Sequence, residues 1–267
     1  MESIFGGLAG LFLFGLIAAA GNLIGGVLLI TSGVHRFGER FLKYLLALGA
    51  GFMLAAIFLE ILPESIGLWT EGKVGESASS AVLGAMTLLL AGYLLLQLFE
   101  HTIAPHFHFG AETHPESFMR PSAAYTAVGG LWIHTFFDGV TIAAAFLVSF
   151  RVGLLVFIAI LLHKVPEGFT VASIMLASKR SARKALLATV AIGGATILGV
   201  IAVALLRTRV DDLVTYALPF SAGVTLYVAA SDLIPEVNHK EDKNPTVSIV
   251  VFVGVALFYL LHKIIEG

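Results

Sequence analysis

Eight long apolar stretches, separated by short polar connectors, make up most of this sequence. They occupy residues 4–30, 41–62, 80–99, 122–149, 152–177, 185–206, 213–235 and 246–265. A helix that spans a lipid bilayer needs roughly 17 to 25 mostly apolar residues, and every stretch reaches that length. We therefore predict an all-α polytopic membrane protein, with eight transmembrane helices in a single domain that covers residues 1–267.

The composition agrees with this class of protein. Only 13% of the residues are charged and 58% are hydrophobic, whereas a soluble domain carries about 25% charged residues. The net charge of -2 leaves no broad basic surface for nucleic acid. The absence of cysteine excludes disulfides and thiolate metal sites. The first stretch, from Ile4, lacks a basic leader and a cleavage site, so we interpret it as a retained helix and not as a signal peptide.

The distribution of Lys and Arg predicts how the helices are oriented. The connectors after the first, third, fifth and seventh stretches, with their flanks, hold ten basic residues, and the opposite side holds five. Basic residues accumulate on the cytoplasmic side, so we expect both chain termini to be extracytoplasmic. The His-containing connector at 100–121 is then a cytoplasmic loop. The remaining basic residue, Lys164, lies within the fifth stretch.

Two internal repeats relate distant parts of the chain. Residues 50–64 and 222–236 align without gaps at an offset of 172, with glycine, proline and glutamate at matching positions. The fourth and fifth stretches align at an offset of 29, which pairs His134 with His163. Aligned helices face opposite ways in the predicted topology, so helices 1–3 form an inverted repeat with helices 6–8, and helix 4 with helix 5. Inverted repeats in transporters place the substrate site near the bilayer midplane.

The motifs HTFFDGV and HKVPEGF place polar side chains deep inside the fourth and fifth stretches. His134 and Asp138 are four residues apart and share one helix face, and His163 and Glu167 repeat this spacing. Charges in the bilayer core cost about 2.5 to 3.5 kcal/mol on insertion scales, so they usually have a partner within the protein. Two helices packed along these faces would bring two imidazoles and two carboxylates together. Such ligands suit divalent transition metals.

A proline and two glycines strengthen this interpretation. Pro166 frees a backbone carbonyl in its helix, and irregular backbone at membrane depth is tolerated where it lines a cavity. Gly139 and Gly168 allow neighbouring helices to approach closely. A purely structural role is the alternative, because each histidine can bond a neighbouring helix and each pair can satisfy itself within its own helix.

The two motifs resemble the fourth- and fifth-helix signatures of the ZIP (Zrt/Irt-like protein) family of divalent metal transporters. The eight helices, the external termini and the His-containing connector after the third helix are also similar to that family. The resemblance implies import of a divalent metal toward the cytoplasm, with Zn²⁺ as the expected metal and Fe²⁺, Mn²⁺ and Cd²⁺ as alternatives. The metal would be cargo, and no catalytic cofactor is expected.

The resemblance also assigns residues to a transport site. His134, Asp138 and Glu167 fall on the family's primary metal ligands, and His163 falls on a position that lines the site. Met53 falls on a second-helix position where some relatives add a thioether ligand, although an ordinary core methionine is the alternative. Asp138 replaces the glutamate that many members have there, and its shorter side chain can shift the metal preference.

Lys164 departs from the family pattern, because many relatives have an acidic or amide residue there that helps to hold a second metal. Thr135 likewise replaces a frequent asparagine. A protonated ammonium cannot coordinate a metal ion, and it repels one nearby. Our hypothesis is that the Lys164 ammonium replaces the second ion and leaves a single metal. Its carboxylate partner would be Asp138, Glu167 or Asp232. Snorkelling toward a polar cavity is the alternative.

Three further glutamates lie at the predicted ends of the second and seventh helices. The predicted topology puts Glu60 and Glu64 at the outer mouth and Glu236 at the inner mouth of a metal pathway, where carboxylates concentrate cations. Solvated helix ends are the alternative. The histidines of the 100–121 connector suit metal gathering or an ordinary flexible loop equally well.

Three other functions stay open at this point. An intramembrane zinc hydrolase would use metal-activated water, but the chain has no HExxH motif and no nucleophilic serine or cysteine beside the histidines. A proton-coupled carrier of an organic substrate would use the histidine-carboxylate pairs as relays, and a metal-gated channel would use them as a gate.

We expect a multi-pass protein of the plasma (cell inner) membrane whose partners are divalent metal ions and the lipid bilayer. A homodimer is compatible with the sequence.

Overall fold

The structure is a computed structural model that describes residues 8–32, 39–72, 77–102, 121–208, 212–238 and 245–266. All regular secondary structure within these ranges is helical. Most of the connector predicted at 100–121 lies outside the described residues, and so do both ends of the chain. The cytoplasmic loop and the side of the termini therefore stay predictions.

The described part of the chain contains eight helices that are long and apolar enough to cross a membrane. Six are single elements: α2 (Leu8–Ser32), α5 (Ala78–Thr102), α6 (Pro121–Val148), α7 (Phe150–Ala177), α8 (Ala182–Leu206) and α11 (Pro245–Glu266). Two are composite: α3 (Glu39–Ala56) continues through η1 (Ile57–Ile61) into α4 (Leu62–Gly72), and α9 (Leu213–Tyr227) continues through η2 (Val228–Leu233) into α10 (Ile234–Asn238). The predicted all-α fold with eight spans is confirmed, and the chain is an integral multi-pass membrane protein.

A single residue separates the fourth and fifth spans. Ser149 has extended backbone angles, and its hydroxyl accepts a hydrogen bond from the backbone N–H of Val152 at 3.1 Å. The serine thus satisfies one of the amides that a helix start leaves unpaired, and α7 begins directly after α6 ends. This tight connection makes α6 and α7 antiparallel neighbours, which brings their histidine-containing faces side by side.

The second span is longer than we predicted. Its expected end at residue 62 is wrong, because the helix continues past Pro63 to Gly72. Pro63 has no N–H to donate to the turn before it, and that turn, Ile57–Ile61, widens into a π-helix while the span continues. The seventh span widens in the same way over Val228–Leu233, before Pro235. The last residues of the two wide turns, Ile61 and Leu233, are 172 positions apart, which is the offset that aligns the two sequences.

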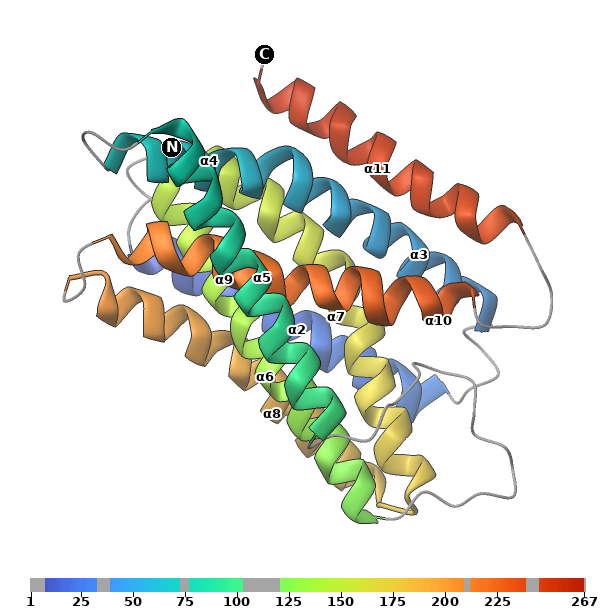
Figure 1. Cartoon of the computed structure of the whole chain (residues 1–267). Coiled ribbons are helices and arrows are strands. Elements are labelled where there is room, and N and C mark those ends of the chain that lie inside the picture. Colours follow the sequence, from blue (N-terminus) through green and yellow to red (C-terminus); the bar gives the residue numbers. More distant parts are fainter. Residues whose placement is uncertain are drawn as a thin grey trace.

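The spans pack as two bundles. The first bundle consists of α2, α6, α7 and α8, and the second consists of α3–α4, α5, α9–α10 and α11. The two bundles meet mainly where α6 packs on α9 and where α3 packs on α7. Figure 1 shows that successive spans run in alternating directions, so that helix ends gather at two opposite sides of the molecule.

Glycines make the closest helix contacts of the first bundle. A Cβ atom on Gly139 of α6 would collide with the carbonyl oxygen of Thr196 on α8. A Cβ atom on the repeat-aligned Gly168 of α7 would collide with the carbonyl oxygen of Asn22 on α2. Only glycine permits backbones to touch in this way, as small residues do between membrane helices.

The second bundle repeats the pattern with another aligned pair. A Cβ atom on Gly51 of α3 would collide with the carbonyl oxygen of Val251 on α11, and one on Gly223 of α9 would collide with that of Leu89 on α5. In the first bundle, the contact of α6 with α8 is thus equivalent to that of α7 with α2. In the second bundle, the contact of α3 with α11 is equivalent to that of α9 with α5. These contacts follow the symmetry of the inverted repeat proposed from the sequence.

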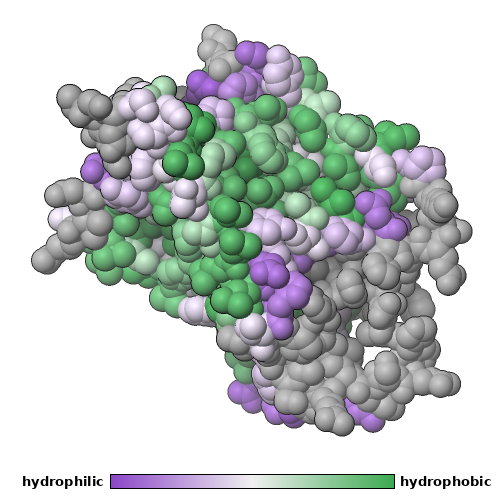
Figure 2. Space-filling view, in the orientation of Figure 1, coloured by the Kyte–Doolittle hydropathy of each residue, from purple (hydrophilic) through white to green (hydrophobic). Residues whose placement is uncertain are grey.

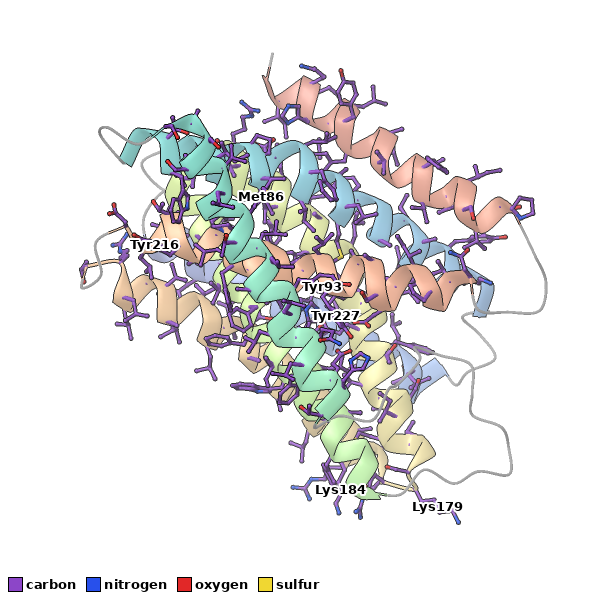
Figure 3. All side chains as sticks on the ribbon, viewed as in Figure 1. Met86, Tyr93, Lys179, Lys184, Tyr216 and Tyr227 are labelled. Carbon is purple, nitrogen blue, oxygen red and sulfur yellow. The ribbon has the colours of Figure 1, made fainter. Side chains whose placement is uncertain are left out.

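The outer surface is apolar where a bilayer would surround it. Figure 2 shows a broad apolar area over the upper and middle part of the visible face. Large exposed apolar side chains include Leu83 on α5 and Phe252 on α11, which is 74% exposed. Lys179 and Lys184 lie together where α7 ends and α8 begins, at the opposite side of the molecule from Tyr216 (Figure 3). This lysine pair belongs to a connector that we predict to be cytoplasmic.

Candidate metal centre

The four predicted ligands from the fourth and fifth spans converge inside the protein. His134 and Asp138 project from successive turns of α6, and His163 and Glu167 do so from α7. Each of the four side chains is at most 3% exposed. One ligand atom from each residue lies within 4.8 Å of the others, so these two imidazoles and two carboxylates could hold a single ion.

Asp138 is at the centre of this group. Its Oδ2 atom lies 3.2 Å from Nε2 of His134, one turn away on the same helix. The same oxygen lies 3.3 Å from Nε2 of His163 on the neighbouring helix. The two imidazole rings are 5.7 Å apart, centroid to centroid.

Several ligand atoms have no hydrogen-bond partner among the described residues. They are Nδ1 of His163, Oδ1 of Asp138 and both ring nitrogens of His134. Nε2 of His134 lies 3.2 Å from Oδ2 of Asp138 but does not form a hydrogen bond with it. Buried polar atoms are nearly always hydrogen-bonded in folded proteins, and exceptions need an explanation such as an ion. This observation favours a ligand set over the structural alternative, in which each pair satisfies itself.

Lys164 contacts both carboxylates of this group. Its ammonium Nζ lies 2.5 Å from Oδ2 of Asp138 and 2.7 Å from Oε2 of Glu167, and its side chain is fully buried. The alternative in which Lys164 snorkels toward a polar cavity does not fit this geometry. The ammonium therefore ties a carboxylate of α6 to a carboxylate of α7.

Two more residues hold Glu167, and sequence reasoning missed both roles. Thr135, one residue after His134, donates its hydroxyl hydrogen bond to Oε1 of Glu167. Asn22 on α2 is fully buried. With its amide oriented to suit its neighbours, it donates to the Lys164 carbonyl oxygen at 2.7 Å and to Oε2 of Glu167 at 3.3 Å. The available signal was a lone amide inside the first apolar stretch.

Comparison with known proteins identifies the family. The sequence model of the ZIP zinc transporter family matches residues 111–262, more than half of the chain and both motifs. The chain belongs to the ZIP family. ZIP13 of Pongo abelii is 29% identical over 210 residues, which cover 77% of this chain and 61% of that protein. The chain therefore spans less than two thirds of that relative.

Other ZIP proteins are similar over a larger share of their length. ZIP9-B of Xenopus laevis is 29% identical over 245 residues, which cover 77% of this chain and 80% of that protein. ZIP13 of Mus musculus is 28% identical over 259 residues, which cover 84% of this chain and 71% of that protein. All three relatives are named as zinc transporters.

Met53 of this ZIP chain is buried on α3. It is 1% exposed and packs with Ala50, Tyr227 and Val228. Gly49, one turn earlier on the same helix face, packs against His163. This placement suits a thioether that completes the ligand set from the second bundle, and it suits a core methionine equally well.

Asp232 lies away from Lys164 in this ZIP chain. The ion-pair partners of Lys164 within the described residues are Asp138 and Glu167. Asp232, in η2, lies close enough to Glu100, near the end of α5, for the two carboxylates to repel each other. The Tyr227 hydroxyl donates a hydrogen bond to Glu100. Figure 3 shows Tyr227 beside Tyr93, whose ring centroid is 5.2 Å away.

The three pathway glutamates have different surroundings. Glu60 is only 6% exposed, and its carboxylate lies 2.6 Å from Nδ1 of His262 on α11 and 3.7 Å from Nη2 of Arg151 on α7. It is thus an ion-paired group inside η1 and not a solvated helix end. Glu64 is half-buried in α4. Glu236 lies in α10, and its side chain is outside the described residues.

Proposed function

We propose that this ZIP protein imports Zn²⁺, or a similar divalent transition metal, toward the cytoplasm by alternating access. The observation that carries the proposal is the buried cluster of His134, Asp138, His163 and Glu167, whose ligand atoms lie within 4.8 Å of one another. The names of the relatives support transport, and the inverted repeat supports alternating access.

The proposed ligands are His134, Asp138 and Glu167, with His163 and Met53 completing the coordination. An incoming dication exchanges its bound water molecules for the carboxylates and imidazoles. A carboxylate binds the metal only when it is deprotonated, and an imidazole only when it is neutral. The site then opens toward the cytoplasm, and the metal leaves. Carboxylate and imidazole together suit Zn²⁺ and leave Fe²⁺, Mn²⁺ and Cd²⁺ as competitors.

We also propose that the site holds one metal, because the Lys164 ammonium occupies the place of a second ion. Its contacts of 2.5 and 2.7 Å to Asp138 and Glu167 support this assignment. Thr135 would then serve to hold Glu167 and not to bind metal. For Glu60, Glu64 and Glu236 we keep a role along the metal pathway as a proposal, and we propose the same role for Asp232. We also propose that the protein forms a homodimer in the plasma membrane.

Purified protein in liposomes provides the decisive test. Radioactive Zn²⁺ is supplied outside, and its uptake is measured alone and in competition with Fe²⁺, Mn²⁺, Cd²⁺ and Co²⁺. We expect saturable uptake of Zn²⁺ that the other ions inhibit to different degrees. Empty liposomes give the background. Uptake no faster than this background for every metal would overturn the proposed function.

A further inference from the structure

The charged side chains at the candidate metal centre all stand on helices of the first bundle. Asp138 stands on α6, and Lys164 and Glu167 stand on α7, within the first bundle. The glycine contacts of α6 with α8 and of α7 with α2 bring helix backbones into direct contact within this bundle. We infer that the first bundle moves as one body, so that exposing the site first to one side and then to the other carries all three charges together.

The three groups set the net charge of the site in each state of the cycle. Two carboxylates and one ammonium give the empty site a charge of -1, and a bound dication changes it to +1. The imidazoles count as neutral, because only the neutral form binds metal. Without Lys164 the same site would carry a charge of -2 when empty and no charge when loaded with a single dication.

This difference matters because the cost of moving a charged site through a poorly polarisable medium rises with the square of its net charge. With Lys164 the empty and loaded sites carry charges of equal size, so neither state is trapped. Without Lys164 the loaded site would move freely, and the doubly charged empty site would be held back. We propose that Lys164 is a built-in substitute cation that lets the empty transporter return without a counter-ion.

The inference rests on the proposed function, because it concerns the return step of a transport cycle. A merely structural ion pair would also use Lys164 to tie α6 to α7. The two roles differ in one measurable way. A structural tie affects all fluxes equally, whereas a substitute cation affects net uptake, which needs the empty return, and spares metal-for-metal exchange, which does not.

The test compares these two fluxes in liposomes at pH 8, where free imidazole is neutral. Net uptake of radioactive Zn²⁺ into empty liposomes and its exchange into Zn²⁺-loaded liposomes are measured for the wild type, Lys164→Met and Lys164→Arg. We expect Lys164→Met to lower the ratio of net uptake to exchange by about tenfold or more. Lys164→Arg keeps the charge and is expected to keep the wild-type ratio.

The wild type alone provides an independent arm, in case Lys164→Met does not fold. Its loaded site carries a charge of +1, so the exchange rate is expected to change severalfold when an inside-negative potential is applied with a potassium gradient and valinomycin. An unchanged flux ratio in folded Lys164→Met, or wild-type exchange that ignores the potential, would overturn the proposal. Absence of both fluxes in the wild type would instead reject the proposed function.

Discussion

The ammonium of Lys164 lies 2.5 Å from Oδ2 of Asp138, the same oxygen that both imidazoles of the candidate metal centre approach. An incoming metal must therefore share this carboxylate with a cation that is already attached to the protein. The metal competes for this oxygen with the Lys164 ammonium and not with water. This relationship makes Lys164 the residue that most clearly sets how many ions the site can hold.

The first prediction concerns the number of bound metals. We expect the wild type to bind one Zn²⁺ per chain within the membrane domain, and Lys164→Gln to bind two, because the amide oxygen can coordinate the ion that the ammonium excludes. Equilibrium dialysis with elemental analysis counts the ions. Two tightly bound ions in the wild type would end the single-metal hypothesis.

Removing two ligands tests the site assignment itself. We expect the double variant His134→Ala, Glu167→Ala to lose Zn²⁺ uptake, because one imidazole and one carboxylate are removed from a four-residue ligand set. Uptake is measured in liposomes after the folding of the purified variant has been checked by its melting temperature. Transport at the wild-type rate would show that the metal crosses elsewhere.

Thr135 offers a finer test of how the site is held. Thr135→Ala removes the hydroxyl that donates to Glu167, and loss of such a supporting hydrogen bond lowers metal affinity by about 10- to 100-fold. Thr87→Ala on α5 is the matched control, because its exposed hydroxyl bonds only the Leu83 carbonyl of its own helix. Equal Zn²⁺ affinities in the two variants, measured by titration calorimetry, would contradict the assigned role.

Acid is expected to slow transport. Protons compete with the metal for imidazole nitrogens and carboxylate oxygens, so each proton displaced on binding lowers the apparent affinity by up to about tenfold per pH unit. We therefore expect the half-saturating Zn²⁺ concentration to rise as the external pH falls from 7.5 to about 5.5. Initial uptake rates at several pH values measure it, and faster uptake in acid would contradict competition at these ligands.

The helix crossings can be tested with two glycines of the same helix. Gly139→Ala places a methyl group against the Thr196 carbonyl oxygen, whereas a Cβ atom on Gly129 meets nothing within 4 Å. Overpacking of this kind costs about 1 to 3 kcal/mol, so we expect a lower melting temperature for Gly139→Ala only. Equal melting of Gly139→Ala and Gly129→Ala would contradict a direct backbone contact between α6 and α8 at Gly139.

The ligand pairs could be predicted from sequence because the fold repeats them. The matched spacings in α6 and α7 put two imidazoles and two carboxylates on helix faces, and the structure brings those faces together. Asn22 could not be found in this way, because its contact with Glu167 depends on how α2 crosses α7. The choice of carboxylate for Lys164 likewise required the packing, since Asp232 was an equal candidate on charge alone.

The end of the second span was mispredicted for a local reason. A proline usually ends a helical pattern, and Pro63 follows directly after a long apolar run. The backbone instead absorbs the missing N–H by widening the preceding turn. No residue type in Ile57–Ile61 signals this outcome, and only the matching proline in the seventh span hints at a shared deformation.

The wide turn also changes which neighbours the second span contacts along its length. Before the turn, α3 packs on α11 and α7; after it, Trp69 packs on Gly84 of α5 and donates its indole N–H to the Thr215 carbonyl oxygen of α9 at 2.9 Å. One residue is worth about 100° of rotation in a helix of 3.6 residues per turn. Deleting one residue from Ile57–Ile61 would therefore turn Trp69 away from Thr215 and leave Met53 in place. The wide turn thus sets the rotation of α4 about the helix axis relative to α3, and with it the neighbours that each segment contacts.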